Sequence, residues 1–274
     1  RLRFARFDLA IDAQGLTKSA VVAWLSGARR RIGFGRPWGR ELSRLLNNEC
    51  VDTTRPHAVD RNLELLRPLG IETPAVRFDV PERPSDRVAA ENWLRSCGVD
   101  DGFVALAPGA GWPSKLWPVS RFATVAAHLA HECKLPVLTI WGSAREQAWA
   151  AEIASAAGKL GRLGPRWTLA QLAAVVRRAK VFVGCDSGPL HLAAAVGTPC
   201  VGLYGPWPAE KHGPYGLGHI AVQKKVCPGS TRQRRLASSE YMDAISVADV
   251  CQACDEILAR SGGPPATALV PPRV

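Results

Sequence analysis

The amino-acid sequence predicts an α/β protein built on doubly wound parallel sheets. Short apolar segments alternate along the chain with segments whose apolar residues recur at helical spacing, and this alternation is typical of parallel sheets covered by helices. The apolar segments are hydrophobic at successive positions, so both faces of each strand are expected to be buried. With 274 residues, 47% of them hydrophobic, the chain is long enough for two such domains.

Four elements are expected near the N-terminus. FDLAID at 7–12 predicts a strand, 17–25 a helix, and 30–34 a second strand. Apolar residues at helical spacing predict a helix over 58–69, and Gly70 is expected to end it.

A Pro-rich, charged segment at 80–86 is interpreted as a linker. The sequence therefore predicts an N-terminal lobe at 1–80, a C-terminal lobe at 81–262 and a loose tail at 263–274.

Strands and helices alternate regularly in the C-terminal lobe. Ser120 and Thr168 are the expected N-caps of two of its helices, because their hydroxyls can accept hydrogen bonds from first-turn amides. Strands are predicted at 103–109, 136–142, 180–186 and 199–205, and helices at 120–132, 144–158, 168–179, 187–197 and 246–260.

Charge and cysteine content narrow the range of functions. The 35 Lys and Arg residues against 24 Asp and Glu give a net charge of +11, which favours anionic partners such as phosphorylated substrates or acidic lipid headgroups. Nucleic acid is not expected, because no recognition motif is present and aromatic residues do not interleave with the basic runs.

Several of the 8 cysteines lie in apolar runs, which suits a reducing cytoplasm. No apolar run is long enough to span a bilayer.

The loop after the strand at 103–109 is the first candidate for ligand binding. Its glycines allow backbone N–H groups to approach a ligand, and a lysine ammonium suits a diphosphate. The loop matches neither a P-loop nor a complete dinucleotide-binding fingerprint, so a tight turn with a solvated lysine is the alternative. The candidate residues are Gly109, Ala110, Gly111 and Lys115.

The second candidate joins the strand at 180–186 directly to a helix. The free N–H groups at the helix start, at Ser187 and Gly188, suit a phosphate. Pro189, the next residue, is included among the donor-binding candidates. The Asp186 carboxylate suits sugar hydroxyls, so the two halves fit a nucleotide sugar. Alternatively, Asp186 caps the helix. His191, one turn further, either faces the ligand or packs in the core.

A third loop, at 204–208 and 212–216, contains Gly, Pro and aromatic residues. It suits either a base or sugar or an ordinary buried connection. The pair Cys251 and Cys254 lies on an apolar helical stripe, which predicts core packing rather than a metal or redox site.

In order along the chain, APGAGWPSKLWP, a strand ending in Trp141-Gly142, and VFVGCDSGPLHLAAAVGTPCVGLYGP resemble the ADP-heptose:lipopolysaccharide heptosyltransferase family, glycosyltransferase family 9. DLAIDAQGLTKSA and HAVDRNLELLRPLGI are similar to the N-terminal part of that family. The resemblance extends over residues 7 to 260 and implies a GT-B fold of two Rossmann-like lobes, the N-terminal one incomplete here.

The resemblance implies transfer of heptose from ADP-heptose to the lipopolysaccharide inner core, with inversion and without a metal or other cofactor. Lys115 would hold the diphosphate and Asp186 the sugar hydroxyls. The Ser187 and Gly188 amides and His191 would complete the donor site, with Trp141 and Gly142 at the base-binding edge. An anionic acceptor of the lipid A/Kdo type would bring the protein to the inner face of the inner membrane. The alternatives are a related transferase with another donor or acceptor, and a nucleotide-sugar-binding protein without catalysis.

The acceptor side is expected in the N-terminal lobe, at Asp12, Gln14, Lys18 and Arg31. The resemblance implies an N-terminal Gly-rich loop whose Asp serves as general base. Because the chain starts at Arg1 without Met, we expect that motif upstream and leave the catalytic base unassigned. Asp12 is interpreted as a turn residue. Arginines at 29–44 and at 232–235 either steer an anionic acceptor or form a solvated surface.

Overall fold

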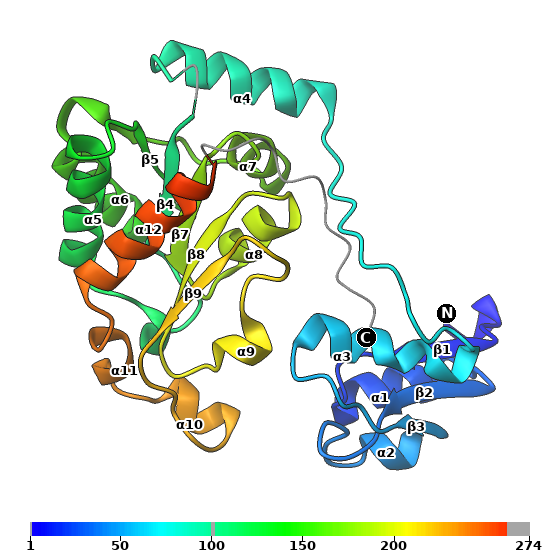
Figure 1. The fold of residues 1–274 in the computed structure, drawn as a ribbon. Helices are drawn as coiled ribbons and strands as arrows, with labels where there is room; N and C mark the ends of the chain where they lie inside the picture. Colours follow the sequence, from blue (N-terminus) through cyan, green and yellow to red (C-terminus); the bar gives the residue numbers. More distant parts are fainter. Residues whose placement is uncertain (1, 100–101, 262–274) are drawn as a thin grey trace. The chain divides into compact units, whose positions relative to one another are not determined.

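The computed structural model describes residues 2–99 and 102–261, which divide into two compact units with the boundary between Arg77 and Phe78 (Figure 1). The tail predicted at 263–274 lies outside the described residues.

The N-terminal unit is a three-stranded parallel sheet in the order β1-β2-β3. Its core consists of Ile32, Phe34, Val51 and Leu65. The strands are β1 (Leu9–Asp12), β2 (Arg30–Phe34) and β3 (Glu49–Val51), and the helices are η1 (Leu2–Ala5), α1 (Thr17–Leu25), α2 (Ser43–Leu46), α3 (Ala58–Leu63) and η2 (Glu64–Leu69).

The helix predicted at 58–69 is present but changes type halfway. It begins as α3 and continues from Glu64 as a 3-10 helix that contains Pro68. Proline lacks an N–H group and its ring crowds the carbonyl four residues earlier, so the tighter winding is expected there. Gly70 ends the helix with φ of 77°, a conformation that glycine adopts without steric cost.

The C-terminal unit contains a six-stranded parallel sheet in the order β6-β5-β4-β7-β8-β9. The strands are β4 (Val104–Ala107), β5 (Val137–Thr139), β6 (Gly161–Leu163), β7 (Val181–Cys185), β8 (Cys200–Tyr204) and β9 (Ile220–Gln223). The helices are α4 (Pro84–Ser96), η3 (Pro113–Lys115), α5 (Val119–His131), α6 (Ala144–Ala156), η4 (Gly158–Leu160), α7 (Leu169–Val176), α8 (Gly188–Ala195), α9 (Ala209–His212), α10 (Thr231–Arg235), α11 (Glu240–Asp243) and α12 (Val247–Ser261).

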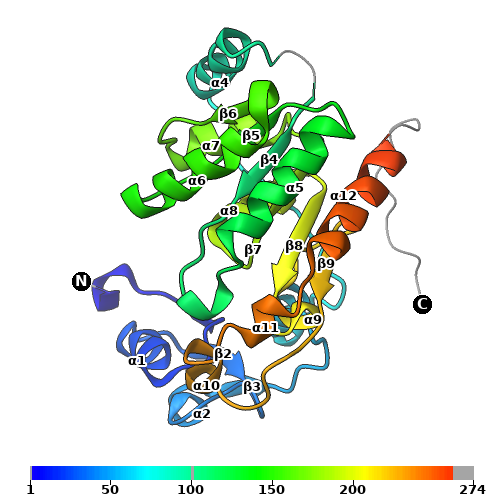
Figure 2. The ribbon, with the colours of Figure 1, turned by 90° about the vertical axis from the view of Figure 1, so that its left-hand side faces the viewer.

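Both faces of this sheet are buried, as the continuous apolar runs predict. Along β4, Val104 and Leu106 join the core that α5, α6 and α12 cover, whereas Ala105 and Ala107 join the core under α4, α7 and α8. Figure 2 shows α5 and α12 side by side on their face of the sheet. Cys254 is fully buried in that core, which confirms the packing role predicted for it.

The structure differs from the sequence-based prediction in several details. Ser120 is not the N-cap of α5, because the helix begins at Val119 and Pro118 occupies the cap position. Thr168 is confirmed as the N-cap of α7, since its hydroxyl accepts a hydrogen bond from Gln171 N. The segment expected to be a linker already contains the start of α4 at Pro84, a residue favoured in the first turn of a helix.

The strands β3, β6 and β9 were not predicted, and each lies at an edge of its sheet. All 8 cysteines are free thiols. None of the helices within the described ranges combines the length and the apolarity that crossing a membrane requires.

The start of α12 is fixed by a reciprocal capping arrangement. Ser246 Oγ accepts a hydrogen bond from Asp249 N at 3.1 Å, and Asp249 Oδ2 accepts one from Ser246 N at 3.0 Å. Asp249 Oδ1 also pairs with Lys224 Nζ at 2.6 Å. The bond from Lys224, with those from Ser246, lowers the pKa of Asp249 to about 2.

We expect Asp249→Ala to lower the free energy of unfolding at pH 7 by about 1 kcal/mol, the usual contribution of a helix cap. Because the folded-state pKa lies below the unfolded value of about 3.9, this contribution is present above pH 4 and is lost as the pH falls towards 2. Urea unfolding of both proteins between pH 7 and pH 2 measures it. The exposed Glu152→Gln serves as control, and a difference between wild type and Asp249→Ala that is independent of pH would contradict the assignment.

Candidate active site

The strand order places the candidate site at one point of the large sheet. From β4 the chain continues outward to β5 and β6, whereas from β7 it continues the other way to β8 and β9. The loops that follow β4 and β7 therefore diverge, and in open parallel sheets ligands bind in the crevice at this point. These are the two loops that the sequence analysis selected.

Three charged or titratable side chains meet there. Lys115 Nζ lies 2.6 Å from Asp186 Oδ2, and His191 Nε2 lies 3.2 Å from Asp186 Oδ1. The side chains of Lys115 and Asp186 are 15% and 9% exposed, whereas that of His191 is 45% exposed. The cluster thus has a buried ion pair at its base and an imidazole that solvent can reach.

The carboxylate of Asp186 is held in its charged form. Burial acts to raise its pKa, but the hydrogen bond from His191 and the positive charge of Lys115 outweigh burial and lower it below the ordinary value. Asp186 therefore does not act primarily as the helix cap considered above. It orients a lysine on one side and a histidine on the other.

The third predicted loop forms a wall of the same site. Lys115 Nζ lies 4.7 Å from the centroid of the Trp207 ring, within the range of a cation–π contact. Gln223, at the end of β9, holds this loop: its Nε2 donates to the carbonyls of Gly205 and Trp207, and its Oε1 accepts from Ala209 N. The loop is thus fixed at three backbone positions.

A basic helix flanks the first loop. In α10, the Arg235 guanidinium lies 4.2 Å from the centroid of the Trp112 ring, and that of Arg234 lies 5.9 Å from the Trp207 ring. From the sequence, these arginines were expected either to steer an anionic acceptor or to form a solvated surface. Their proximity to the site comes from the fold, and no local sequence signal indicates it.

The start of α8 is available to a ligand. Ser187, its N-cap residue, has an extended conformation, and its side chain makes no capping hydrogen bond. Among the described residues, Ser114 Oγ, Ser187 Oγ and Trp207 Nε1 are buried polar atoms without a hydrogen-bond partner. Such groups are uncommon in folded proteins and call for an explanation, and all three lie in the loops that surround the cluster.

Other predicted residues are already engaged. A Cβ atom at Gly109 would lie 2.5 Å from Glu146 Oε1, so this glycine makes room for a side chain of α6. Glu146 Oε2 also accepts a hydrogen bond from Gly142 N at 2.7 Å, and Trp141 Nε1 donates to the carbonyl of Gly164 at 2.6 Å.

The remaining predicted residues of these loops differ in their surroundings. Ala110 packs against the core. No atom would contact a Cβ at Gly111 or Gly188, so both positions face open space. Pro189 lies in the first turn of α8.

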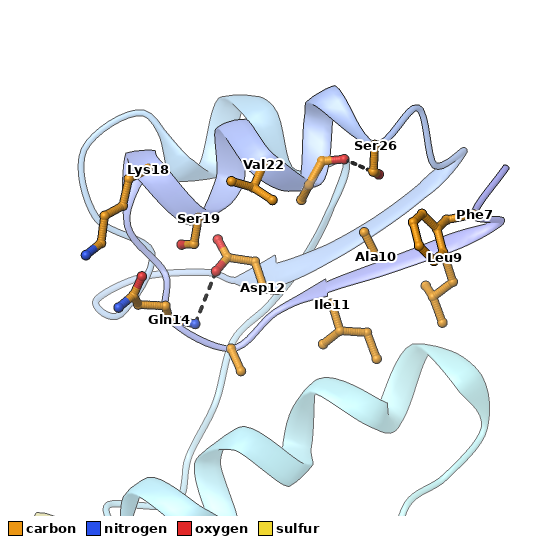
Figure 3. Close-up of a pocket in the computed structure, with 12 residues that line it drawn as sticks. Phe7, Leu9, Ala10, Ile11, Asp12, Gln14, Lys18, Ser19, Val22 and Ser26 are labelled. Carbon is orange, nitrogen blue, oxygen red and sulfur yellow. Dashed lines mark hydrogen bonds between the residues drawn. The ribbon is translucent and has the colours of Figure 1, made fainter. Parts of the chain in front are cut away.

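In the N-terminal unit, three of the four residues predicted for the acceptor side line one pocket of about 640 Å³ beside β1 and α1 (Figure 3). These residues are Asp12, Gln14 and Lys18. Arg31 is not among the lining residues, and its guanidinium donates to the carbonyls of Ala28 and Leu46.

Asp12 has the surroundings of a turn residue, as predicted. Its Oδ1 accepts hydrogen bonds from the amides of Gln14 and Gly15, both at 3.1 Å, and its Oδ2 accepts one from Asn47 Nδ2 at 3.2 Å. The side chain closes the turn after β1 and connects it to the end of α2.

Similarity to known proteins identifies the family of the chain. The chain matches the model of glycosyltransferase family 9 (heptosyltransferase) over residues 1–241, and it belongs to this family. It is 30% identical over 225 residues to lipopolysaccharide heptosyltransferase 1 of Pseudomonas aeruginosa, which covers 80% of this chain and 60% of that protein. It is 27% identical over 271 residues to lipopolysaccharide heptosyltransferase 3 of Escherichia coli, covering 95% of this chain and 78% of that protein.

Solved structures share the fold. The E. coli heptosyltransferase WaaC with ADP-2-deoxy-2-fluoro heptose aligns with a TM-score of 0.65 at 26% identity, over 91% of this chain and 72% of that one. A family 9 glycosyltransferase from Veillonella parvula aligns with a TM-score of 0.76 at 21% identity, over 92% and 74%. The chain therefore has the α/β GT-B fold that its sequence predicts.

We expect Asp12→Ala to destabilise the N-terminal unit by roughly 1–3 kcal/mol, because it leaves buried donors without an acceptor. Asp12→Asn should cost less, since rotation of the Asn47 amide would let its oxygen, which has no partner in the described structure, accept from the new side chain. Denaturant unfolding of both variants measures the difference. Equal losses would contradict this account of the turn.

Proposed function

We propose that the protein is an inverting heptosyltransferase that moves heptose from ADP-heptose to the lipopolysaccharide inner core. The observation that carries the proposal is the Lys115–Asp186–His191 cluster at the divergence of the β4 and β7 loops. Membership of family 9 and the fold shared with WaaC support the choice of donor. The C-terminal unit would bind the nucleotide sugar and the N-terminal unit the acceptor.

In this proposal the pyrophosphate lies against positive groups from two elements. The Lys115 ammonium provides one, and the first-turn amides of α8 at Ser187 and Gly188, with the positive end of the helix dipole, provide the other. Negative charge grows on the departing diphosphate as the bond to the sugar breaks. Groups that are already oriented stabilise that charge without reorganisation.

The sugar would lie over Asp186 and His191. Asp186 Oδ2 pairs with Lys115 and Oδ1 with His191, and a carboxylate oxygen can accept more than one hydrogen bond. Asp186 would therefore accept from sugar hydroxyls while it keeps Lys115 in place. His191, the most exposed member of the cluster, can contact the edge of the six-membered sugar ring from the side of α8.

The nucleotide base would contact the edge formed by Trp141 and Gly142. Because the indole N–H of Trp141 and the amide of Gly142 already donate within the protein, the contact would be made through apolar surface rather than through these donors. The acceptor would meet Gln14 and Lys18 in the N-terminal unit, at the inner face of the membrane that carries it.

We expect Lys115→Ala to weaken binding of ADP and of ADP-heptose equally, by roughly 10- to 100-fold, which corresponds to one charge-assisted hydrogen bond of about 1.5–3 kcal/mol. Asp186→Asn should differ. It releases Lys115 from its ion pair, so ADP binding should be kept or strengthened, while the advantage of ADP-heptose over ADP should disappear. Isothermal titration calorimetry with both ligands measures these effects.

The matched control is Lys159→Ala, because Lys159 is exposed and precedes β6, at the amino ends of the strands. Unchanged ADP affinity in Lys115→Ala would show that the pyrophosphate lies elsewhere.

The choice of donor is tested by titrating the wild-type chain with ADP-heptose and with UDP-glucose. The affinity for ADP-heptose should exceed that for UDP-glucose by at least about 10-fold, or 1.4 kcal/mol, and preference for UDP-glucose would reject the donor assignment.

Incubation of the protein with ADP-heptose and a Kdo-bearing lipid A precursor should give a product of inverted anomeric configuration by NMR. Donor binding without transfer would favour a nucleotide-sugar-binding protein instead.

A further inference from the structure

Three side chains with metal-binding donor atoms meet outside the candidate active site. His128 and Cys133 come from the last turn of α5 and the turn that follows it, and Asp255 comes from α12. One ligand atom of each, an imidazole nitrogen, a thiol sulfur and a carboxylate oxygen, lie within 4.8 Å of one another. This is the one such group of three found among the described residues.

The distances between the donor atoms suit a common ion. His128 Nε2 lies 3.0 Å from Asp255 Oδ1 and 3.2 Å from Oδ2, and Cys133 Sγ lies 3.5 Å from Asp255 Oδ1. With metal–ligand bonds of about 2.0–2.3 Å, neighbouring ligands of a tetrahedral zinc ion are separated by about 3.3–3.8 Å. The imidazole–carboxylate and thiol–carboxylate separations are therefore within a few tenths of an ångström of those in a tetrahedral zinc site.

The chemistry of the donors selects a class of metal. Cysteine binds a metal as its thiolate, so an ion bound at Cys133 has to displace the thiol proton. Ions that bind thiolate strongly, such as zinc or cobalt, achieve this, whereas magnesium and calcium prefer oxygen ligands alone. A mixed set of nitrogen, sulfur and oxygen donors is typical of zinc.

The surroundings of the cluster favour a structural role. The core residues of α5 and α12 pack together, so an ion held by His128, Cys133 and Asp255 would join two helices that are already in contact. Asp255 is the more exposed member of its pair with His128, since its side chain is 48% exposed against 26% for His128. An ion can therefore enter from solvent.

The cluster is also separate from the nucleotide-sugar loops. In parallel α/β units each helix returns the chain to the amino end of the next strand, so the end of α5 lies near the start of β5. The candidate active site is at the carboxyl ends of the strands.

We propose that His128, Cys133 and Asp255 bind a zinc-class divalent cation that fastens α12 to α5. Three protein ligands leave one tetrahedral position. Water fills it, because Asp255 is exposed to solvent.

The test uses the full chain, purified without a histidine tag and freed of metal by a chelator. Cobalt should bind with a stoichiometry of one and give a thiolate-to-cobalt charge-transfer band together with the intense visible bands of tetrahedral cobalt. The band intensity should correspond to one thiolate per cobalt. Zinc should displace the cobalt and raise the melting temperature by several degrees when it is in large excess over its dissociation constant. Magnesium should do neither.

Cys133→Ser and Asp255→Asn should each weaken zinc binding by more than about 10-fold, which is the smallest effect usual even for residues that contact a metal only through its ligands. Cys50→Ser, a change at an exposed cysteine of the N-terminal unit, should leave zinc binding unchanged. His128→Gln provides a third variant if Cys133→Ser does not fold. Absence of the charge-transfer band at stoichiometric cobalt, or its persistence in Cys133→Ser, would overturn the proposal.

Discussion

The ion pair between Lys115 and Asp186 is the interaction on which the organisation of the C-terminal unit's site depends. Both side chains are largely buried, and a buried charge is costly unless a partner of opposite charge accompanies it. Each residue therefore needs the other in place. Because β4 and β7 are neighbours, with Ala107 beside Gly184, the loops that follow them start from adjacent positions. The parallel order of the sheet thus brings together two residues that are far apart in the sequence.

Much of the fold could be predicted from the sequence because the central strands carry strong signals. In β4, β7 and β8 every residue is buried, and the corresponding apolar runs predicted all three. The edge strands β3, β6 and β9 contain partly exposed residues, and they are short. An edge strand packs against only one neighbour, so its sequence carries a weaker pattern. One of the two predicted helix caps is correct. Thr168 is the N-cap of α7, but α5 begins at Val119, so Ser120 lies inside the helix and not at its cap.

The site was predictable as a set of loops but not as a set of contacts. Helix-terminal and Gly-rich motifs identified the loops that contain Lys115 and Asp186. Sequence reasoning assigned these two residues to different parts of a ligand, whereas the structure pairs them directly. The sequence also showed no sign that Glu146 belongs to this region. Its carboxylate fills the space beside Gly109 and accepts a hydrogen bond from the Gly142 amide. A carboxylate in the first turn of α6 reads from sequence as an ordinary capping residue, and it is one. The contact of Glu146 with Gly109 depends on the placement of β4 beside β5, which the local sequence does not show.

The net charge of +11 gives less information about partners than its size suggests. Several basic side chains already form ion pairs or hydrogen bonds within the protein. Arg30 forms two hydrogen bonds with Glu49, and Arg121 donates to the carbonyls of Asp243 and Ile245. At the site, Lys115 is balanced by Asp186. Extra positive charge for an anionic ligand must therefore come from groups without a carboxylate beside them, namely the α8 amides and the arginines of α10. In the proposed function, binding of a diphosphate would thus depend on the placement of a few positive groups around the β4 and β7 loops, and the overall charge of the chain would contribute mainly through long-range attraction.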